Sequence, residues 1–255
     1  MIKFFRHIRR SLLNQNKMGK YFKYAIGEIL LVMVGILLAL QVNTWNNNRI
    51  EANREQTVLK NLRSDFNDLV AELDRIYDNT EESYESSLRL LDIIKDESQI
   101  NPAEIETLLN SIINGFSSLD LNSGSIDEIK NSGSLSTIKD VKLREQISSW
   151  SFIEADMEDD IEIYYDYLFN TLIPSLSNKA ILRNMAVPEF LMERFDLPQV
   201  SRSKYKVDYS KTMRTLEFEN EVYNNAVNVI YVLDNYKKID TYLHDTLELI
   251  EANIK

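Results

Sequence analysis

The stretch of residues 24–45 constrains the whole chain, because it is about 20 residues long and almost wholly apolar. Residues 29–40 carry no polar side chain, and in the wider range 25–42 Glu28 is the one charged exception. A helix needs roughly 20 apolar residues to cross about 30 Å of hydrocarbon. We therefore expect a transmembrane helix over residues 24–45.

Charge predicts the orientation of this helix. The first 24 residues carry seven basic and no acidic side chains, whereas the other 231 hold 22 basic and all 40 acidic ones. Positive charge beside a first membrane helix resists translocation, so we expect a cytoplasmic N-terminus. In a bacterium with two membranes, the chain is then a single-pass inner-membrane protein whose C-terminal domain is periplasmic. Tyr24 and Trp45 fit interfacial aromatic anchors.

A cleaved signal peptide is the alternative to an anchor. Its apolar core usually has about 7–15 residues and is followed by a small-x-small cleavage site. Residues 41–44, QVNT, do not offer that pattern cleanly. The sequence therefore favours an uncleaved signal anchor.

Residues 1–23 form a basic segment on the expected cytoplasmic side. Their apolar residues recur at spacings of three and four, which predicts an amphipathic helix lying on an anionic inner leaflet. A basic topology signal without fixed structure is the alternative, and residues 14–20 are expected to form a hinge. The basic side chains expected to contact the leaflet are Lys3, Arg6, Arg9 and Arg10.

One face of the expected membrane helix carries small residues and the carboxylate of Glu28. Small residues let two helix backbones approach, and a polar side chain in lipid needs a partner. We expect helix–helix association through this face. The alternative is that Glu28, close to the cytoplasmic border, extends toward Lys23 or the headgroups. The residues expected at the joint are Gly27, Glu28, Leu31, Gly35 and Ala39.

Most catalytic and metal-binding chemistry finds no support in the sequence. There are no cysteines, no Gly-rich phosphate loop, and two histidines, His7 and His244, on opposite sides of the expected membrane helix. The run 120–127 faintly resembles a calcium loop, but Lys130 stands where a bidentate Glu is required. A net charge of −11 argues against nucleic acid binding. We expect no enzyme activity and no cofactor.

Six glycines and four prolines in 255 residues predict long helices. The first is expected to continue from the membrane to about Glu97, the second to cover 102–116, and the third to cover 139–172, ending before Pro174. The acidic run from Glu154 to Glu162 is expected to be a solvated face of the third helix. These helices predict an all-α fold, a transmembrane helix followed by an elongated antiparallel helical bundle over residues 46–255.

The first and last of these helices show seams of apolar residues at alternating spacings of four and three. The last is widened by Tyr223, Ile230 and Ile239. Residues 117–138 are expected to form a packed turn region with two Ser-Gly turns, and residues 204–209 a short extended segment. The first seam consists of Leu62, Phe66, Leu69, Leu73 and Ile76, is irregular at Thr80 and Ser83, and resumes with Tyr84, Leu88, Leu91 and Ile94. The last consists of Val222, Ala226, Val229, Leu233, Tyr236, Leu243, Leu247 and Ile250.

The N-terminal segments MIKFFRHIRRSLL and KYFKYAIGEILLVMVGILLALQVNTWNNNR closely resemble the opening of an uncharacterised family of Bacteroidota membrane proteins, known as a domain of unknown function. The resemblance covers residues 1–50. It implies the same membrane topology and carries no activity or catalytic residues. The matching positions include Gly27, Glu28, Gly35, Gln41, Asn43 and Trp45.

Two functions fit these observations. The first is a non-enzymatic scaffold or sensor of the envelope, anchored in the lipid bilayer, that forms a homo-oligomer and binds a partner protein or ligand in the periplasm. The second is a subunit of an oligomeric ion- or proton-handling membrane assembly that uses Glu28.

Overall fold

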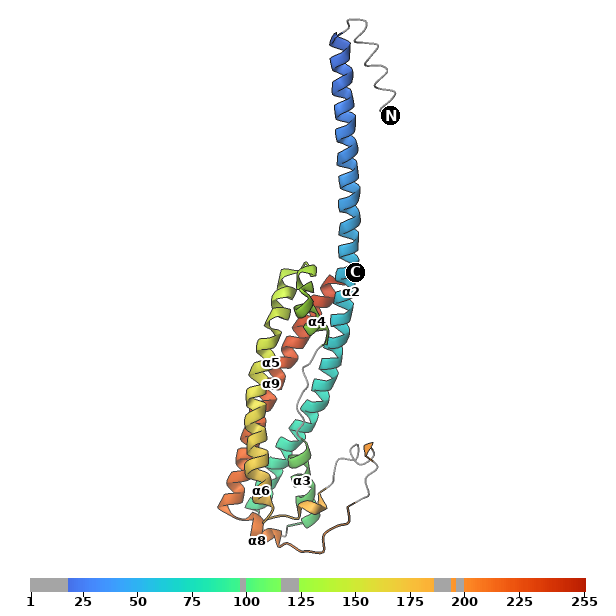
Figure 1. The fold of residues 1–255 in the computed structure, drawn as a ribbon. Coiled ribbons are helices and arrows are strands. Elements are labelled where there is room, and N and C mark those ends of the chain that lie inside the picture. The colour runs from blue at the N-terminus through green and yellow to red at the C-terminus, as the bar shows by residue number, and fades with distance from the viewer. Residues whose placement is uncertain (1–17, 97–99, 116–123, 186–193, 196–199) are drawn as a thin grey trace. The chain divides into compact units, whose positions relative to one another are not determined.

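The computed structural model describes residues 18–96, 100–115, 124–185, 194–195 and 200–255. These residues form helices and irregular connections, without strands, as the all-α prediction requires. The chain divides into two compact units, Met1–Thr57 and Val58–Lys255. Figure 1 labels the elements.

Helix α2, Met18–Lys95, contains the apolar stretch and continues into the second unit. It has no proline along its 78 residues, so every backbone N–H beyond the first turn can join the helical hydrogen-bond ladder. This confirms the prediction that one helix continues to about Glu97. Met18, Gly19 and Lys20, which were expected to lie in a hinge, are helical instead.

The seam of α2 continues without a break, and this corrects the expected irregularity at Thr80 and Ser83. Both of these side chains are fully buried, and the 4-3 spacing is kept throughout. The hydroxyl groups of Thr80 and Ser87 can occupy the apolar seam because each donates to a carbonyl one turn back in the helix. The buried seam consists of Leu62, Phe66, Leu69, Leu73, Ile76, Thr80, Ser83, Ser87 and Leu90.

The predicted resumption of the seam at Tyr84 is therefore wrong by one residue. Tyr84, Leu91 and Ile94 are only partly buried, and Leu88 is 42% exposed. These residues flank the core on α2 and do not form its centre.

Helix α3, Pro102–Asn114, begins as predicted with proline in its first turn. The side chain of Asn101 caps it by accepting from the backbone N–H of Ala103 at 3.1 Å. Two polar contacts join α3 to α2: Arg89 pairs with Glu104 at 2.9 Å, and Ser111 donates to Glu82 at 2.8 Å.

The region expected to be a packed turn contains helix α4, Gly124–Ser132, and a 3₁₀ turn, η1, Ser134–Thr137. Gly124 is the first residue of α4, and Ser123, the other residue of the predicted Ser123-Gly124 turn, lies outside the described residues. The turn at Gly133 is confirmed, with φ of +70°. Residues 120–123 of the calcium-like run lie outside the described residues, and Lys130 at its closing position donates to Ser151.

Helix α5, Val141–Tyr167, is followed directly by a π turn, η2, Leu168–Leu172, and by α6, Ile173–Leu176. The prediction that the helix ends before Pro174 is therefore wrong. The π turn starts a new hydrogen-bond register, in which the N–H of Ile173 bonds to Leu168 O. Pro174 then lies in the first turn of α6, where its missing N–H costs little. The short 3₁₀ turn η3, Leu182–Asn184, follows.

Residues 204–208 form no strand and lead into α8, Tyr209–Met213, so the last residue of the predicted extended segment is helical. Helix α9, Leu216–Asn253, carries the predicted seam, all buried except Leu247, which is half-buried. Ile239 widens the buried face as predicted. Tyr223 and Ile230 do not: they are 58% and 45% exposed.

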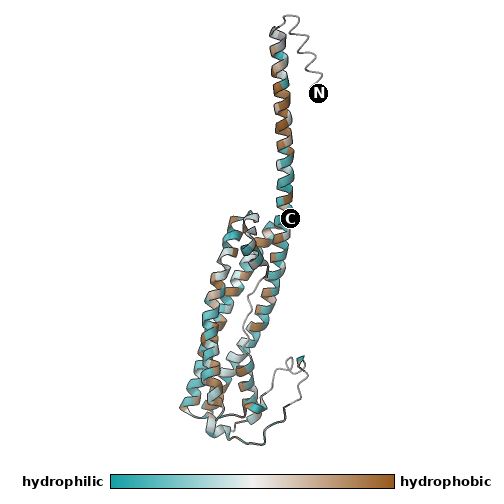
Figure 2. Ribbon diagram, in the orientation of Figure 1, coloured by the Kyte–Doolittle hydropathy of each residue, from teal (hydrophilic) through white to brown (hydrophobic). Residues whose placement is uncertain are grey.

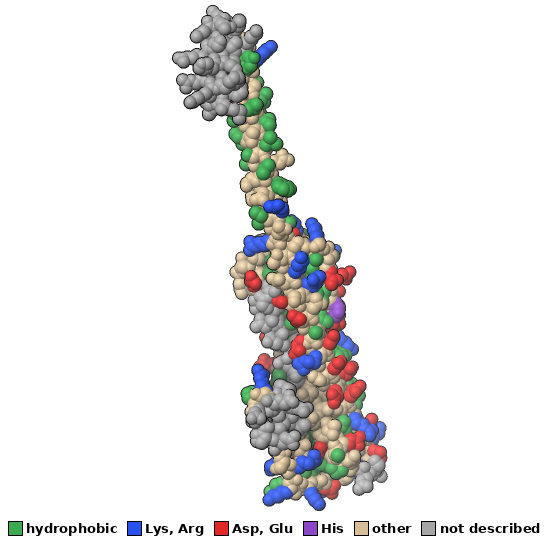
Figure 3. All heavy atoms as spheres, turned by 90° about the vertical axis from the view of Figure 1, so that its right-hand side faces the viewer, with side chains coloured by type: hydrophobic (Ala, Val, Ile, Leu, Met, Phe, Trp, Pro, Cys, Tyr) green, Lys and Arg blue, Asp and Glu red, His purple; other side chains and the backbone are tan. Residues whose placement is uncertain are grey.

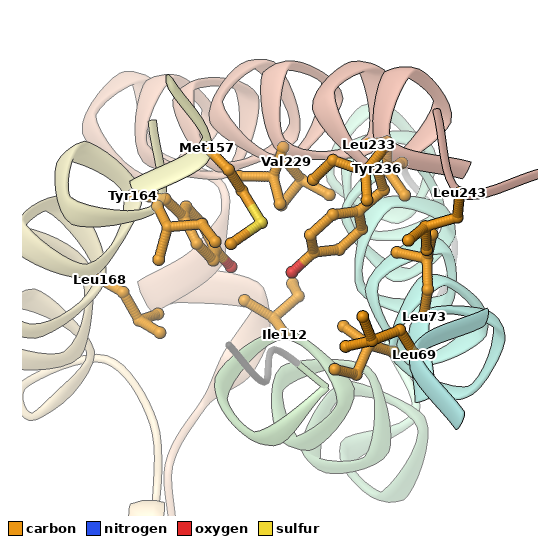
Figure 4. Close-up of a cluster of buried hydrophobic side chains, with 14 of the residues drawn as sticks. Leu69, Leu73, Ile112, Met157, Tyr164, Leu168, Val229, Leu233, Tyr236 and Leu243 are labelled. Atoms are coloured by element: carbon orange, nitrogen blue, oxygen red, sulfur yellow. The ribbon is translucent and has the colours of Figure 1, made fainter. Parts of the chain in front are cut away.

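The core of the second unit is built mainly by α2, α3, α5 and α9, and α4, η2, α6 and α8 also contribute buried residues to it. Helices α5 and α9 are antiparallel, since Tyr167 bonds Glu221 while Gln146 bonds Tyr242. Figure 4 shows α5 and α9 side chains meeting those of α2 and α3.

Candidate functional site

The apolar segment of α2 is the first candidate. By length and composition, α2 is long and apolar enough to cross a membrane, and none of the residues in its apolar window is buried. Leu31 is 55% exposed and Ile29 is 66% exposed. Figure 2 shows this segment as the most hydrophobic part of α2. Exposing so large an apolar surface to water is unfavourable, which makes the segment a candidate membrane span.

The small residues of the face predicted to associate are exposed within the part of the chain that the structure describes. Gly27, Gly35 and Ala39 are exposed, and a Cβ added at Gly27 or Gly35 would meet no atom within 4 Å. Glu28 is half-buried and has an interaction partner in its own chain. No contact within the described chain therefore uses these small residues.

Both expected interfacial anchors are exposed, Tyr24 by 53% and Trp45 by 64%. The guanidinium of Arg49 lies 5.6 Å from the centroid of the Trp45 ring and also bonds Asn46 at 3.4 Å. Arg49 was not among the interfacial residues predicted from the sequence. The basic residues Lys3, Arg6, Arg9 and Arg10 lie outside the described residues.

A buried polar layer crosses the core of the second unit and is the second candidate. Asn225 Nδ2 donates to Ser87 Oγ at 3.0 Å, and the hydroxyl of Tyr164 donates to Asn225 Oδ1 at 3.4 Å. Figure 4 shows the hydroxyls of Tyr164 and Tyr236 pointing toward the centre of the core. The layer consists of Thr80, Ser83 and Ser87 of α2, Tyr164 of α5, and Asn225 and Tyr236 of α9, each fully buried.

The tyrosines of this layer are held in their neutral form. Burial raises the pKa of Tyr164 to about 12, although the side chains of Ser83 and Asn225 oppose the rise. Burial likewise raises the pKa of Tyr236, against the opposing effect of Thr80. Both hydroxyls therefore keep their protons and can donate hydrogen bonds at neutral pH, and neither acts as a base there.

Two ionic clusters lie around the connections between α6, α8 and α9. Lys179 is 9% exposed and pairs with Glu221 at 2.8 Å and with Glu217 at 3.1 Å. Thr212 of α8 donates to the backbone oxygen of Lys179 at 2.9 Å. Ser175 of α6 completes this cluster by bonding Glu221 at 2.5 Å.

The second ionic cluster surrounds Glu106 of α3, which is 8% exposed. Its carboxylate accepts from Asn184 at 2.8 Å, from Tyr209 at 3.3 Å and from Arg202. Each carboxylate in these clusters is paired, as a buried charge requires.

A family model described as a family of unknown function (DUF6090) matches residues 28–168. The chain belongs to this family. No curated protein and no solved structure matches the chain.

The DUF6090 match begins at Glu28 and ends at Leu168. It therefore covers most of the apolar segment and the parts of the polar layer that α2 and α5 contribute. Helix α9, which contributes Asn225 and Tyr236, lies beyond the matched range.

Metal ligands do not gather in this DUF6090 member. Among the residues that the structure describes, no three His, Asp or Glu side chains come together in a way that could hold a metal ion. His244 is exposed on α9 and lies 3.1 Å from Asp240, one turn away. The expectation that the protein is not an enzyme stays a prediction.

The acidic run of α5 lies mostly in solvent. Glu154 and Asp160 are half-buried, and Asp160 accepts from Asn235 of α9 at 2.6 Å. Figure 3 views the second unit from the side opposite α5 and shows acidic side chains interspersed with basic ones along one edge. The exposed members are Asp156, Glu158, Asp159 and Glu162.

Proposed function

We propose that this DUF6090 member is a non-enzymatic, single-pass membrane protein of the bacterial envelope. Its second unit acts as a scaffold or sensor that binds a partner or ligand in the periplasm, and the anchored chain self-associates. The observation that carries the proposal is the apolar segment of α2, none of whose window residues is buried. The basic residues before it and the acidic excess after it support a cytoplasmic N-terminus in the inner membrane.

Cysteine labelling tests the topology, because the chain has no native cysteine. Asn14→Cys and Ser148→Cys place one thiol on each side of the segment. In spheroplasts, a membrane-impermeant maleimide should label Ser148→Cys and should reach Asn14→Cys only after the membrane is broken. The opposite pattern, or equal labelling at both positions before lysis, would overturn the topology.

Self-association through the stripe of Gly27, Glu28, Leu31, Gly35 and Ala39 is supported by its two glycines, beside which an added Cβ would meet no atom of the described residues within 4 Å. The mass of the detergent-solubilised particle measures it. Gly35→Leu should lower that mass, because a leucine keeps the backbones apart. Leu37→Ala, on another face, is the matched control and should leave it unchanged.

An ion-handling assembly is the second candidate, and the observation that favours it is the carboxylate of Glu28 within an apolar segment. Glu28→Gln keeps a hydrogen-bonding side chain of the same size but removes the charge. A scaffold should keep its particle mass and cell phenotype with this change. An ion-coupled assembly should lose its coupling while its mass stays the same.

A further inference from the structure

A cation–π contact between Lys237 of α9 and Tyr77 of α2 lies at the outer edge of the groove between these two helices. The ammonium group of Lys237 lies 5.9 Å from the centroid of the Tyr77 ring. These two residues also line a shallow groove with Leu73, Asp74 and Asp240. The two helices are antiparallel here, because Arg214 near the start of α9 donates to the backbone oxygen of Asp96 after the end of α2.

Residues seven apart keep the same position relative to a packed neighbouring helix. Seven and fourteen residues after Tyr77, α2 carries Tyr84 and Leu91; seven and fourteen residues before Lys237, α9 carries Ile230 and Tyr223. The edge that begins with a tyrosine and a lysine therefore continues with the pairs Tyr84–Ile230 and Leu91–Tyr223. It becomes apolar on both helices.

This apolar edge is exposed. Ile230 is 45% exposed, Tyr223 58%, and Leu216, seven residues further back on α9, 74%. Leu88 of α2 is 42% exposed, and Tyr84 and Leu91 are half-buried. We call these six residues the edge strip. The other large exposed apolar residues of the second unit include Phe152 and Ile163, which lie among the acidic residues of α5.

We propose that the edge strip is the contact surface for the second unit of another copy of this chain, with a two-fold axis parallel to the helices. This proposal rests on the self-association proposed above, and it assigns that association a second contact outside the membrane segment. The axis would place the α2 side of one strip against the α9 side of the other. Rotation about such an axis does not change the height of a residue along the helices. Residues of α2 and α9 that lie at the same height within one chain, such as Leu91 and Tyr223, therefore also lie at the same height in the two chains of the dimer.

The size of the strip favours a tethered second copy over a free soluble partner. A stable interface removes roughly 800 Å² from water on each partner, and a fully buried aromatic side chain supplies about 150–250 Å². Four large side chains that are 42–74% exposed supply about half of that area. Such a surface binds weakly in solution. Anchoring two copies in one membrane raises their effective concentration and makes a contact of this size sufficient.

The test crosslinks two differently tagged full-length chains co-expressed in the membrane, each with one cysteine. One chain carries Leu88→Cys and the other Tyr223→Cys; a short bismaleimide then joins only thiols of different chains. The matched control pairs Leu88→Cys with Phe152→Cys, an exposed aromatic position on α5. We expect the first pair to crosslink about tenfold more than the control. We also expect Ile230→Lys, at an exposed position, to abolish the difference while circular dichroism shows unchanged helix content.

Equal crosslinking of the two pairs, or crosslinking unaffected by Ile230→Lys, would overturn the proposal. The particle mass of Gly35→Leu separates this failure from failure of membrane-segment association. If the crosslink is absent while Gly35→Leu still lowers the mass, the edge strip is wrong and the stripe stands. If the crosslink forms while Gly35→Leu leaves the mass unchanged, the edge strip stands and the stripe is wrong.

Discussion

The amide nitrogen of Asn225 on α9 donates a hydrogen bond to the hydroxyl of Ser87 on α2, 3.0 Å away in the fully buried core. A hydrogen bond between two buried polar groups adds little net stability, but leaving either group buried without a partner lowers the stability considerably. Sliding α9 along α2 by one turn would separate Asn225 from Ser87 and place it beside apolar Leu90 in one direction and beside Ser83 in the other. The pair therefore fixes the register of the two helices, as a single polar residue does in coiled coils.

Replacing one member of this pair should destabilise the second unit. Asn225→Ala leaves the hydroxyls of Ser87 and Tyr164 without that partner, which costs roughly 1–3 kcal/mol. Urea unfolding of the full chain in detergent measures the loss. Trp150, which is 2% exposed, serves as the fluorescent reporter of the second unit in a Trp45→Phe background.

The neighbouring exposed residue Asn224 supplies the control, and Asn224→Ala should change the free energy of unfolding little. Ser87→Ala combined with Asn225→Leu should cost less than the sum of the single changes, because neither polar group is then left alone. Additive losses would contradict the pairing.

The polar layer also makes stability depend on alkaline pH. Burial raises the pKa of Tyr164 to about 12, from about 10 in the unfolded chain. Because the folded state holds the proton more tightly, this stabilisation is complete below pH 10 and is lost as the pH rises toward 12. Tyr164→Phe should remove a fall on the order of 2 kcal/mol over this window.

The measurement is the free energy of unfolding at pH 8, 10 and 12 for the wild-type chain and for Tyr164→Phe. Burial raises the pKa of Tyr167, Tyr209 and Tyr242 too, so the variant should keep part of the alkaline loss. Tyr205, which is 73% exposed, provides the control Tyr205→Phe. An unchanged pH dependence in Tyr164→Phe would contradict the assignment.

Spacing was sufficient to predict the long helices and most of the core, since apolar residues at 4-3 intervals are the direct cause of burial. It failed where polar side chains occupy core positions. Thr80 and Ser83 seemed to interrupt the seam because both are polar, yet both are fully buried, and the hydroxyl of Thr80 donates to the helix's own backbone, to Ile76 O at 2.8 Å. Because Thr80 and Ser83 were not assigned to the buried seam, the seam was wrongly predicted to resume at Tyr84 and Leu88.

Sequence predicted the apolar segment and its flanking charges, because these are local properties of one helix. It missed the buried polar layer, whose partners Ser87 and Asn225 are 138 residues apart. It also missed the π turn before Pro174, since the altered register depends on tertiary packing. The exposure of Tyr223 and Ile230 could not be foreseen, because a wide apolar face on α9 is compatible with either core or interface.

The turn at Gly133 predicts a purely backbone effect. Its φ of +70° disfavours any residue with a Cβ, yet a Cβ there would meet no atom within 4 Å. Gly133→Ala should therefore lower the free energy of unfolding by roughly 1–2 kcal/mol. Gly133→Asn should cost less, because asparagine tolerates the left-handed region. Equal losses would show that the side chain, and not the backbone angle, is responsible.

The pair formed by Lys179 and Glu221 predicts a large effect from a single charge. Their side chains are 11% and 13% exposed, so Lys179→Met leaves a carboxylate nearly buried beside Ser175. Breaking a buried pair on one side costs roughly 3–5 kcal/mol.

The pair of Lys238 and Asp234 is the matched control. It is similar in length, at 2.8 Å, but its side chains are 64% and 60% exposed. Lys238→Met should therefore change stability little, because exposed pairs are screened by water. Adding Glu221→Leu to Lys179→Met should restore most of the loss, since the cost lies in the charge left behind. If the double variant is less stable than Lys179→Met, then Glu221 stabilises this end of the bundle through contacts other than its charge.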